Sequence, residues 1–133
     1  MNFETEFEKH LPATILEKSV KTGPEYAIPF PEVLEAVHIA TAKNIAVLGV
    51  ETFSVVEEGL QCEGSSGYEF ELGDDWVSFV RANNDQALKE IAEAGHHAAT
   101  RFILTTTSKS EFDELESAQF RAQLGLGPKN RKS

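Results

Sequence analysis

The stretch Ile45-Ala-Val-Leu-Gly-Val-Glu-Thr-Phe-Ser-Val-Val-Glu-Glu58 decides the fold. It is rich in the β-branched and aromatic residues that strands favour, so it predicts a long strand, with a bend at Gly49. Residues 59–67 contain several glycines and serines and predict a loop. In Tyr68-Glu-Phe-Glu-Leu72 apolar residues alternate with glutamates, as in a strand with one buried face. We therefore expect an antiparallel hairpin of 45–58 and 68–72, joined by the loop 59–67.

Two helices are expected before this hairpin. The first covers 13–20 and stops at Gly23-Pro24, since this pair does not continue a helix. The second covers 31–44, because Pro31 suits the first helical position and apolar residues recur after it at helical spacing. Between the two helices, the prolines around residues 26–30 predict an extended connector.

Two more helices are expected after the hairpin, along a single apolar stripe. Asp74 or Asp75 can cap the first of them, because aspartate side chains accept hydrogen bonds from the free backbone amides at a helix start. Asn83 can cap the second helix in the same way. These caps divide the stripe into helices over 75–81 and 84–94.

A third strand and a last helix complete the chain. Residues 101–107 predict the strand, and Ser108-Lys-Ser-Glu111 has the spacing of a capping box that opens a helix to about residue 123. The order of elements predicts an α+β fold, with a small, mostly antiparallel sheet of about three or four strands and helices packed on one face. We expect one domain over 1–124 and a disordered basic tail over 125–133.

The charge balance limits the partners that this chain can have. Its 133 residues include 22 acidic and 12 basic ones, for a formal net charge of −10. Such a surface repels nucleic acid and anionic membranes and attracts cationic surfaces. The sequence contains no apolar run long enough for a membrane helix, and its acidic start does not have the pattern of a secretory signal. Because the single Cys62 cannot form an internal disulfide, we expect a cytoplasmic protein.

Acidic residues are concentrated in the middle of the chain. No lysine or arginine occurs between Lys43 and Arg81, whereas glutamate and aspartate recur throughout this segment. Like charges on neighbouring strands destabilise their pairing by up to about 1 kcal/mol, so folding alone gives no reason to gather them. Solubility is the alternative explanation. We predict a partner-binding surface made of Glu57, Glu58, Glu63, Glu69, Glu71, Asp74 and Asp75.

The sequence offers no pattern for a catalytic residue, a metal ion or a cofactor. Its four histidines lack metal-ligand spacing, and His38 is expected to be partly buried beside the apolar stripe of its helix. Cys62 lies beside Glu63, whose negative charge disfavours a reactive thiolate. The glycine-rich segment 59–67 lacks the lysine of a phosphate-binding loop. We therefore predict a binding protein that is not an enzyme.

Two other kinds of function stay open at this point. A small enzyme or small-molecule-binding protein would have a pocket between the helices and the sheet, with His38, Asn83 or Thr105 as polar residues. A self-associating regulatory subunit would present an exposed apolar strand edge.

Four segments carry a family resemblance: Leu34-Glu-Ala-Val-His-Ile-Ala-Thr-Ala-Lys43, Tyr68-Glu-Phe-Glu-Leu72, Trp76-x-x-Phe-Val80-x-x-Asn83-Asn84, and Phe102-Ile-Leu-Thr-Thr-Thr-Ser108 with Glu111-Phe112. They resemble small immunity proteins of bacterial polymorphic-toxin systems, of the contact-dependent inhibition type. The resemblance implies a small cytoplasmic α+β domain, often acidic, that blocks a toxin made beside it. It assigns no toxin-contacting residue, so the acidic positions above rest on charge and strand alternation alone.

Overall fold

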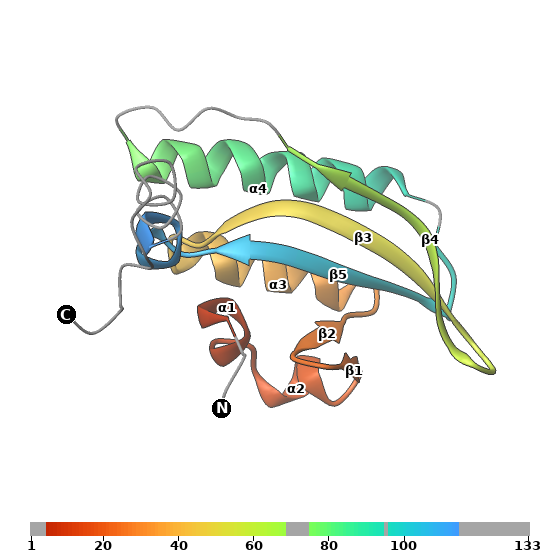
Figure 1. Cartoon of the computed structure of the whole chain (residues 1–133). Helices are drawn as coiled ribbons and strands as arrows, with labels where there is room; N and C mark the ends of the chain where they lie inside the picture. The colour runs from red at the N-terminus through yellow and green to blue at the C-terminus, as the bar shows by residue number, and fades with distance from the viewer. Residues whose placement is uncertain (1–4, 69–74, 95, 115–133) are drawn as a thin grey trace, which may run out of the picture.

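The computed structural model describes residues 5–68, 75–94 and 96–114. Its central element is β3 (Ala46–Val56), a long curved strand that lies between β4 (Gly59–Gly67) and β5 (Thr100–Thr107) (Figure 1). Both neighbours pair with β3 in the antiparallel direction. The predicted α+β class with an antiparallel sheet is confirmed.

Two helices cover one face of this sheet. α3 (Glu32–Ala42) and α4 (Trp76–Glu93) pack against each other and against β3 (Figure 1). The antiparallel register places Val50 of β3 beside Leu104 of β5 on this face. Both residues join a buried core whose other main members are Val33, Val37, Ala87, Ile91 and Phe102.

The N-terminal segment forms two short helices and a small hairpin, namely α1 (Glu6–Lys9), α2 (Ala13–Leu16), β1 (Val20–Thr22) and β2 (Glu25–Ala27). The predicted helix begins at residue 13 as expected but ends at Leu16 and not at residue 20, and the expected extended connector starts as the paired strand β2. Gly23-Pro24 is the turn of the hairpin rather than a simple helix stop, and Gly23 adopts a left-handed φ of 60°. After β2, the backbones of Ile28 and Phe102 exchange hydrogen bonds of 2.7 and 2.8 Å, which fix the hairpin beside β5.

The strand that pairs with β3 is not the predicted one. Residues 59–67 were expected to be a loop, but they are the strand β4, and Glu57 and Glu58 alone form the turn before it. The low strand propensity of this glycine-rich segment is overridden because β4 is an edge strand. Its exposed side chains need no core, and backbone pairing with β3 supplies the stabilisation. Of the predicted strand 68–72, only Tyr68 belongs to the described residues, and it packs against the core as expected.

α4 continues without a break through Asn83, where the sequence predicted a second N-cap. The predicted cap at Asp75 is confirmed, because its carboxylate accepts a hydrogen bond of 3.0 Å from the amide of Val77. Asn83 and Asn84 are each only 1% exposed. Asparagine at a helix start usually faces water, so its burial here shows that tertiary contacts, and not local capping, decide this part of the chain.

The side chain of Asn84 joins α4 to the connection between α3 and β3. Its amide oxygen accepts a hydrogen bond of 2.7 Å from the amide of Val47. Its amide nitrogen donates to the carbonyl oxygen of Ile45 at 3.0 Å and to the hydroxyl of Thr41 at 2.8 Å. By contrast, the Oδ1 atom of Asn83 has no hydrogen-bond partner among the described residues.

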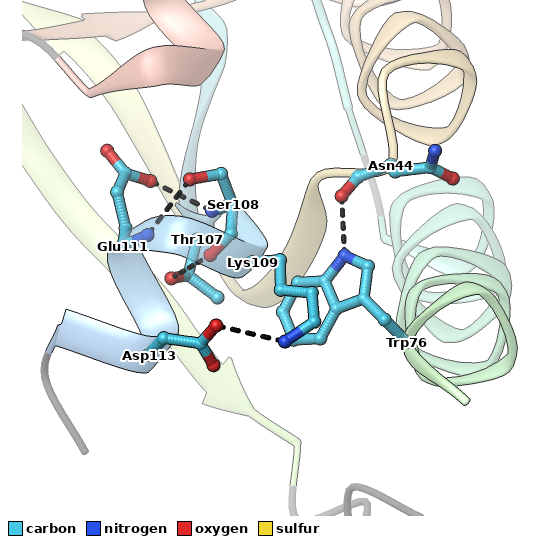
Figure 2. Close-up of polar contacts among 7 residues, drawn as sticks. All are labelled: Asn44, Trp76, Thr107, Ser108, Lys109, Glu111 and Asp113. Carbon is cyan, nitrogen blue, oxygen red and sulfur yellow. Dashed lines mark hydrogen bonds and ion pairs between the residues drawn. The ribbon is translucent and has the colours of Figure 1, made fainter. Parts of the chain in front are cut away.

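The same end of the sheet, where β3 begins and β5 ends, is closed by a capping box and a tryptophan (Figure 2). Ser108 and Glu111 form the predicted box, with a 2.8 Å hydrogen bond from the Ser108 amide and a 3.2 Å hydrogen bond from the Glu111 amide. The helix that they open is described as far as residue 114. Opposite it, the indole nitrogen of Trp76 donates to the carbonyl oxygen of Asn44 at 2.7 Å, and Asn44 has a left-handed φ of 58° that asparagine tolerates.

Replacing Asn84 by leucine should lower the free energy of unfolding by about 2–4 kcal/mol, because it leaves the buried amide of Val47 and the carbonyl of Ile45 unsatisfied. The matched control is Asn83→Leu. It should change stability by less than about 1 kcal/mol, since Asn83 makes one intrahelical bond to Phe79 and its oxygen has no partner among the described residues. Urea denaturation measures both, and equal losses would contradict the assignment.

Gly49 should be required for the pairing of β3 with β4. A Cβ atom there would lie 2.5 Å from the backbone oxygen of Ser66, which cannot move without breaking the pairing. We expect Gly49→Ala to cost about 1–3 kcal/mol. Gly64→Ala is the control, because a Cβ atom at Gly64 meets nothing within 4 Å, and it should be neutral or slightly stabilising in the same denaturation experiment.

Candidate partner-binding surface

The fold places the predicted acidic residues at two separate ends of the sheet. Glu57 and Glu58 form the β3–β4 turn and Glu63 lies along β4, and all three are exposed. α4 begins at the opposite end of the sheet (Figure 1). The carboxylate of Asp75 caps this helix start. The hairpin residues are therefore available to a partner, whereas Asp75 has a structural role. The remaining predicted positions, Glu69, Glu71 and Asp74, lie outside the described residues.

A groove of about 510 Å³ lies between the small β1–β2 hairpin and the strands β3 and β4. Because side chains alternate along a strand, Glu51 and Phe53 of β3 and Ile103 of β5 point away from the helices. These three residues line the groove together with Leu60 of β4 and Glu25 of β2. The groove thus combines an apolar lining with two carboxylates, on the face of the sheet that the helices leave uncovered.

The surroundings of Glu25 disfavour the ionised form of its carboxyl group. Partial burial is the largest cause that raises the pKa of Glu25 above its ordinary value, and the charges of Glu51 and Glu8 raise this pKa further. Glu8 is itself buried, where its carboxylate accepts hydrogen bonds of 2.9 and 2.8 Å from the amide and hydroxyl of Thr5. A partly buried carboxylate with a raised pKa in a groove is a candidate for a binding position.

The two groove carboxylates have no neutralising ion pair within the described part of the chain. The ion pairs found there join Lys18 to Glu32 and Lys109 to Asp113. Neither pair contributes a residue to the groove. The strand neighbours of Glu51 on both sides are uncharged, because it lies opposite a serine of β4 and an isoleucine of β5.

Two bases beside the groove make contacts of their own within the described part of the chain. Lys21 lines the groove, but its ammonium group lies 4.5 Å from the centre of the Tyr26 ring, in a cation–π contact. Arg101 of β5 donates hydrogen bonds of 2.8 and 2.9 Å to the carbonyl oxygens of Ala98 and Thr100. The groove lining keeps a net negative charge, because its two carboxylates outnumber the single ammonium group of Lys21.

Of the two groove carboxylates, Glu51 could be found from the sequence. It alternates with Phe53 and Val55 along the predicted strand, which places all three on one face. Glu25 carries no local signal. It reaches the groove because the Ile28–Phe102 pairing fixes the small hairpin beside β5, and that contact joins residues far apart in the chain.

A second hollow of about 310 Å³ lies at the other end of the sheet, beside Trp76 and Lys109 (Figure 2). Its main polar groups already have partners. The Trp76 indole donates to the Asn44 carbonyl, and the ammonium group of Lys109 lies 2.9 Å from the carboxylate of Asp113. These contacts close the sheet end, so this hollow has a structural role and the groove is the better candidate site.

The polar residues of the small-molecule hypothesis are not brought together. His38 is exposed on α3, which corrects the expectation that it is partly buried. Asn83 is buried in α4, where its amide nitrogen donates to the carbonyl of Phe79 at 2.8 Å. Thr105 is exposed on the face of β5 that points away from the helices. Over the described ranges, the structure also contains no group of three potential metal-ligating side chains placed to hold an ion.

Comparisons with protein-family profiles, curated protein sequences and solved structures found no match to this chain. Among the helices that the structure describes, none is both long enough and apolar enough to cross a membrane. The function must therefore be argued from the geometry and charge of the surface itself.

Replacing Glu25 by glutamine should raise the melting temperature at pH 7. Because folding raises the pKa of Glu25, the folded protein binds this proton more tightly than the unfolded chain. The free energy of unfolding therefore falls as pH rises from the ordinary glutamate pKa of about 4.3 to the raised pKa of the folded protein. Above the raised pKa this loss of stability stays constant. Thermal scans of both proteins at pH 7 and at pH about 3.5 measure this difference.

The stabilisation by Glu25→Gln should vanish at the acidic pH, where the wild-type carboxyl is protonated in both states. Asp85→Asn is the matched control, since Asp85 is exposed on α4, and it should change little at either pH. A gain from Glu25→Gln that is equal at both pH values would contradict the electrostatic cause.

Proposed function

We propose that this protein is a cytoplasmic immunity protein, which binds a bacterial toxin domain with a basic surface and blocks its activity. The proposal is carried by the exposed carboxylates of the β3–β4 hairpin and the groove beside it. Among the described residues, these carboxylates have no ion-pair partner. The resemblance of the sequence to small immunity proteins suggests the class of partner, and the charge suggests the chemistry of its surface.

The geometry of the hairpin suits a docking element. The β3–β4 turn, which carries Glu57 and Glu58, extends beyond the neighbouring elements at one end of the sheet (Figure 1). Charges on a projecting turn act on an approaching partner over about one Debye length, roughly 8–10 Å at physiological ionic strength. Phe53 and Leu60 lie in the adjacent groove and offer apolar surface next to these charges.

This arrangement suggests how inhibition would work. A toxin that acts on nucleic acid, such as a nuclease, needs a cationic groove for its substrate. An acidic hairpin that occupies this groove excludes the substrate and is attracted by the same charges. The charges speed association, while the apolar surface that is buried on docking slows dissociation.

Replacing Glu57, Glu58 and Glu63 together by lysine should slow association with the toxin by about tenfold or more at low salt, because the reversed charges repel a basic surface. The first step is co-expression with the product of the neighbouring gene, followed by copurification and a growth-rescue test. Association rates are then measured by stopped flow at several salt concentrations.

The control changes the net charge equally at positions away from the hairpin. Glu17, Glu35 and Asp85 are all exposed and lie after α2, on α3 and on α4. Their replacement by lysine should slow association much less than the hairpin variant does. A neighbouring product that is harmless, or that does not bind this protein, would contradict the immunity function itself.

A further inference from the structure

We propose that the groove between the β1–β2 hairpin and β3 binds an arginine side chain that the protein partner presents. The guanidinium group would lie between the carboxylates of Glu25 and Glu51. This inference rests on the proposed function, because it names one specific contact that the partner makes.

The two carboxylates create a site for one positive charge. Both line the same groove, one from each side, since Glu25 comes from β2 and Glu51 from β3. The repulsion between the two carboxylates favours the binding of a cation, because the positive charge offsets it. Among the described residues, neither Lys21 nor Arg101 forms an ion pair with these carboxylates, since Lys21 lies over the Tyr26 ring and Arg101 is bonded to backbone carbonyls.

The apolar lining favours arginine over lysine. Phe53, Leu60 and Ile103 offer surface for the aliphatic part of a long side chain. A guanidinium group is planar and weakly hydrated, so it stacks on an aromatic ring and leaves water at a lower cost than an ammonium group does. Its several N–H donors can also reach two carboxylates at the same time.

The shape of the groove favours a side chain that belongs to a protein. Lys21, Thr22 and Gly59 line the groove and are exposed, so it is open along its side and does not enclose a ligand. It also adjoins the turn with Glu57 and Glu58, because Gly59 and Leu60 directly follow that turn. A partner steered to the turn by charge would therefore bring its own side chains over the groove.

The first test uses the full chain and three short peptides, acetyl-Gly-Arg-Gly-amide and its lysine and citrulline analogues. In ¹H–¹⁵N NMR titrations the arginine peptide should shift the amides of Thr22, Leu60 and Ile103, with a Kd of roughly 1–10 mM. The lysine peptide should bind more weakly. Citrulline has nearly the same shape without the charge, so shifts of equal size with its peptide would overturn the proposal.

Variants then locate the contact. The double variant Glu25→Gln/Glu51→Gln should weaken binding of the arginine peptide by at least about fivefold, since both charged acceptors are lost. It is expected to fold, because it removes repulsion. Asp85→Asn should leave binding unchanged. Binding that survives in the double variant would overturn the proposal, as would agmatine binding tenfold more tightly than the peptide, since the site would then suit a free small cation.

The toxin assay separates this inference from the proposed function. If the neighbouring gene product binds and the double variant loses about tenfold or more in affinity, both stand. If the double variant binds it as tightly as the wild type, while the hairpin lysine variant does not, the immunity function stands and the groove contact is wrong. If the arginine peptide binds as expected and no neighbouring product is neutralised, the groove recognises arginine but the toxin assignment is wrong.

Discussion

The buried amide of Asn84 is the contact on which the rest of this fold depends. It bonds α4 to the backbone of Ile45 and Val47 and to the hydroxyl of Thr41, so one side chain joins a helix, a turn and the first residues of a strand. A buried amide that satisfies its donors and its acceptor stabilises one arrangement and penalises every other, because any shift leaves polar groups unpaired. This contact therefore fixes where β3 begins and which of its faces meets the helices.

The position of β3 determines the two surfaces of the molecule. Val47 and Val50 contribute to the core beneath α3 and α4, while Glu51 and Phe53 face the uncovered side. Since β4 pairs with β3 alone within the described sheet, the acidic turn and the lining of the groove follow from the same register. The packing of one face of β3 beneath α3 and α4 thus determines which charged and apolar side chains its other face presents.

The negative charge of Glu25 in the groove opposes folding. Carboxylates that repel each other, and one that is partly buried, reduce stability, whereas a folded core of this size tolerates such a cost. In the proposed complex, the cationic surface of the partner replaces this repulsion by attraction. The negative charge of Glu25 opposes folding but would favour the proposed binding of a cation. The charge of Asp75, by contrast, stabilises a helix start.

Local sequence determined the α+β class, the strands around 46–56 and 100–107, the Asp75 cap and the Ser108–Glu111 box, since propensity and capping act over a few residues. It also determined the acidic character of the chain's middle. Only the tertiary structure decided that 59–67 is the edge strand, that α4 continues through Asn83, and that Glu25 meets Glu51. The physical reason is that these outcomes depend on backbone pairing and buried hydrogen bonds between segments distant in the chain, whose energies exceed the local preferences that a sequence displays.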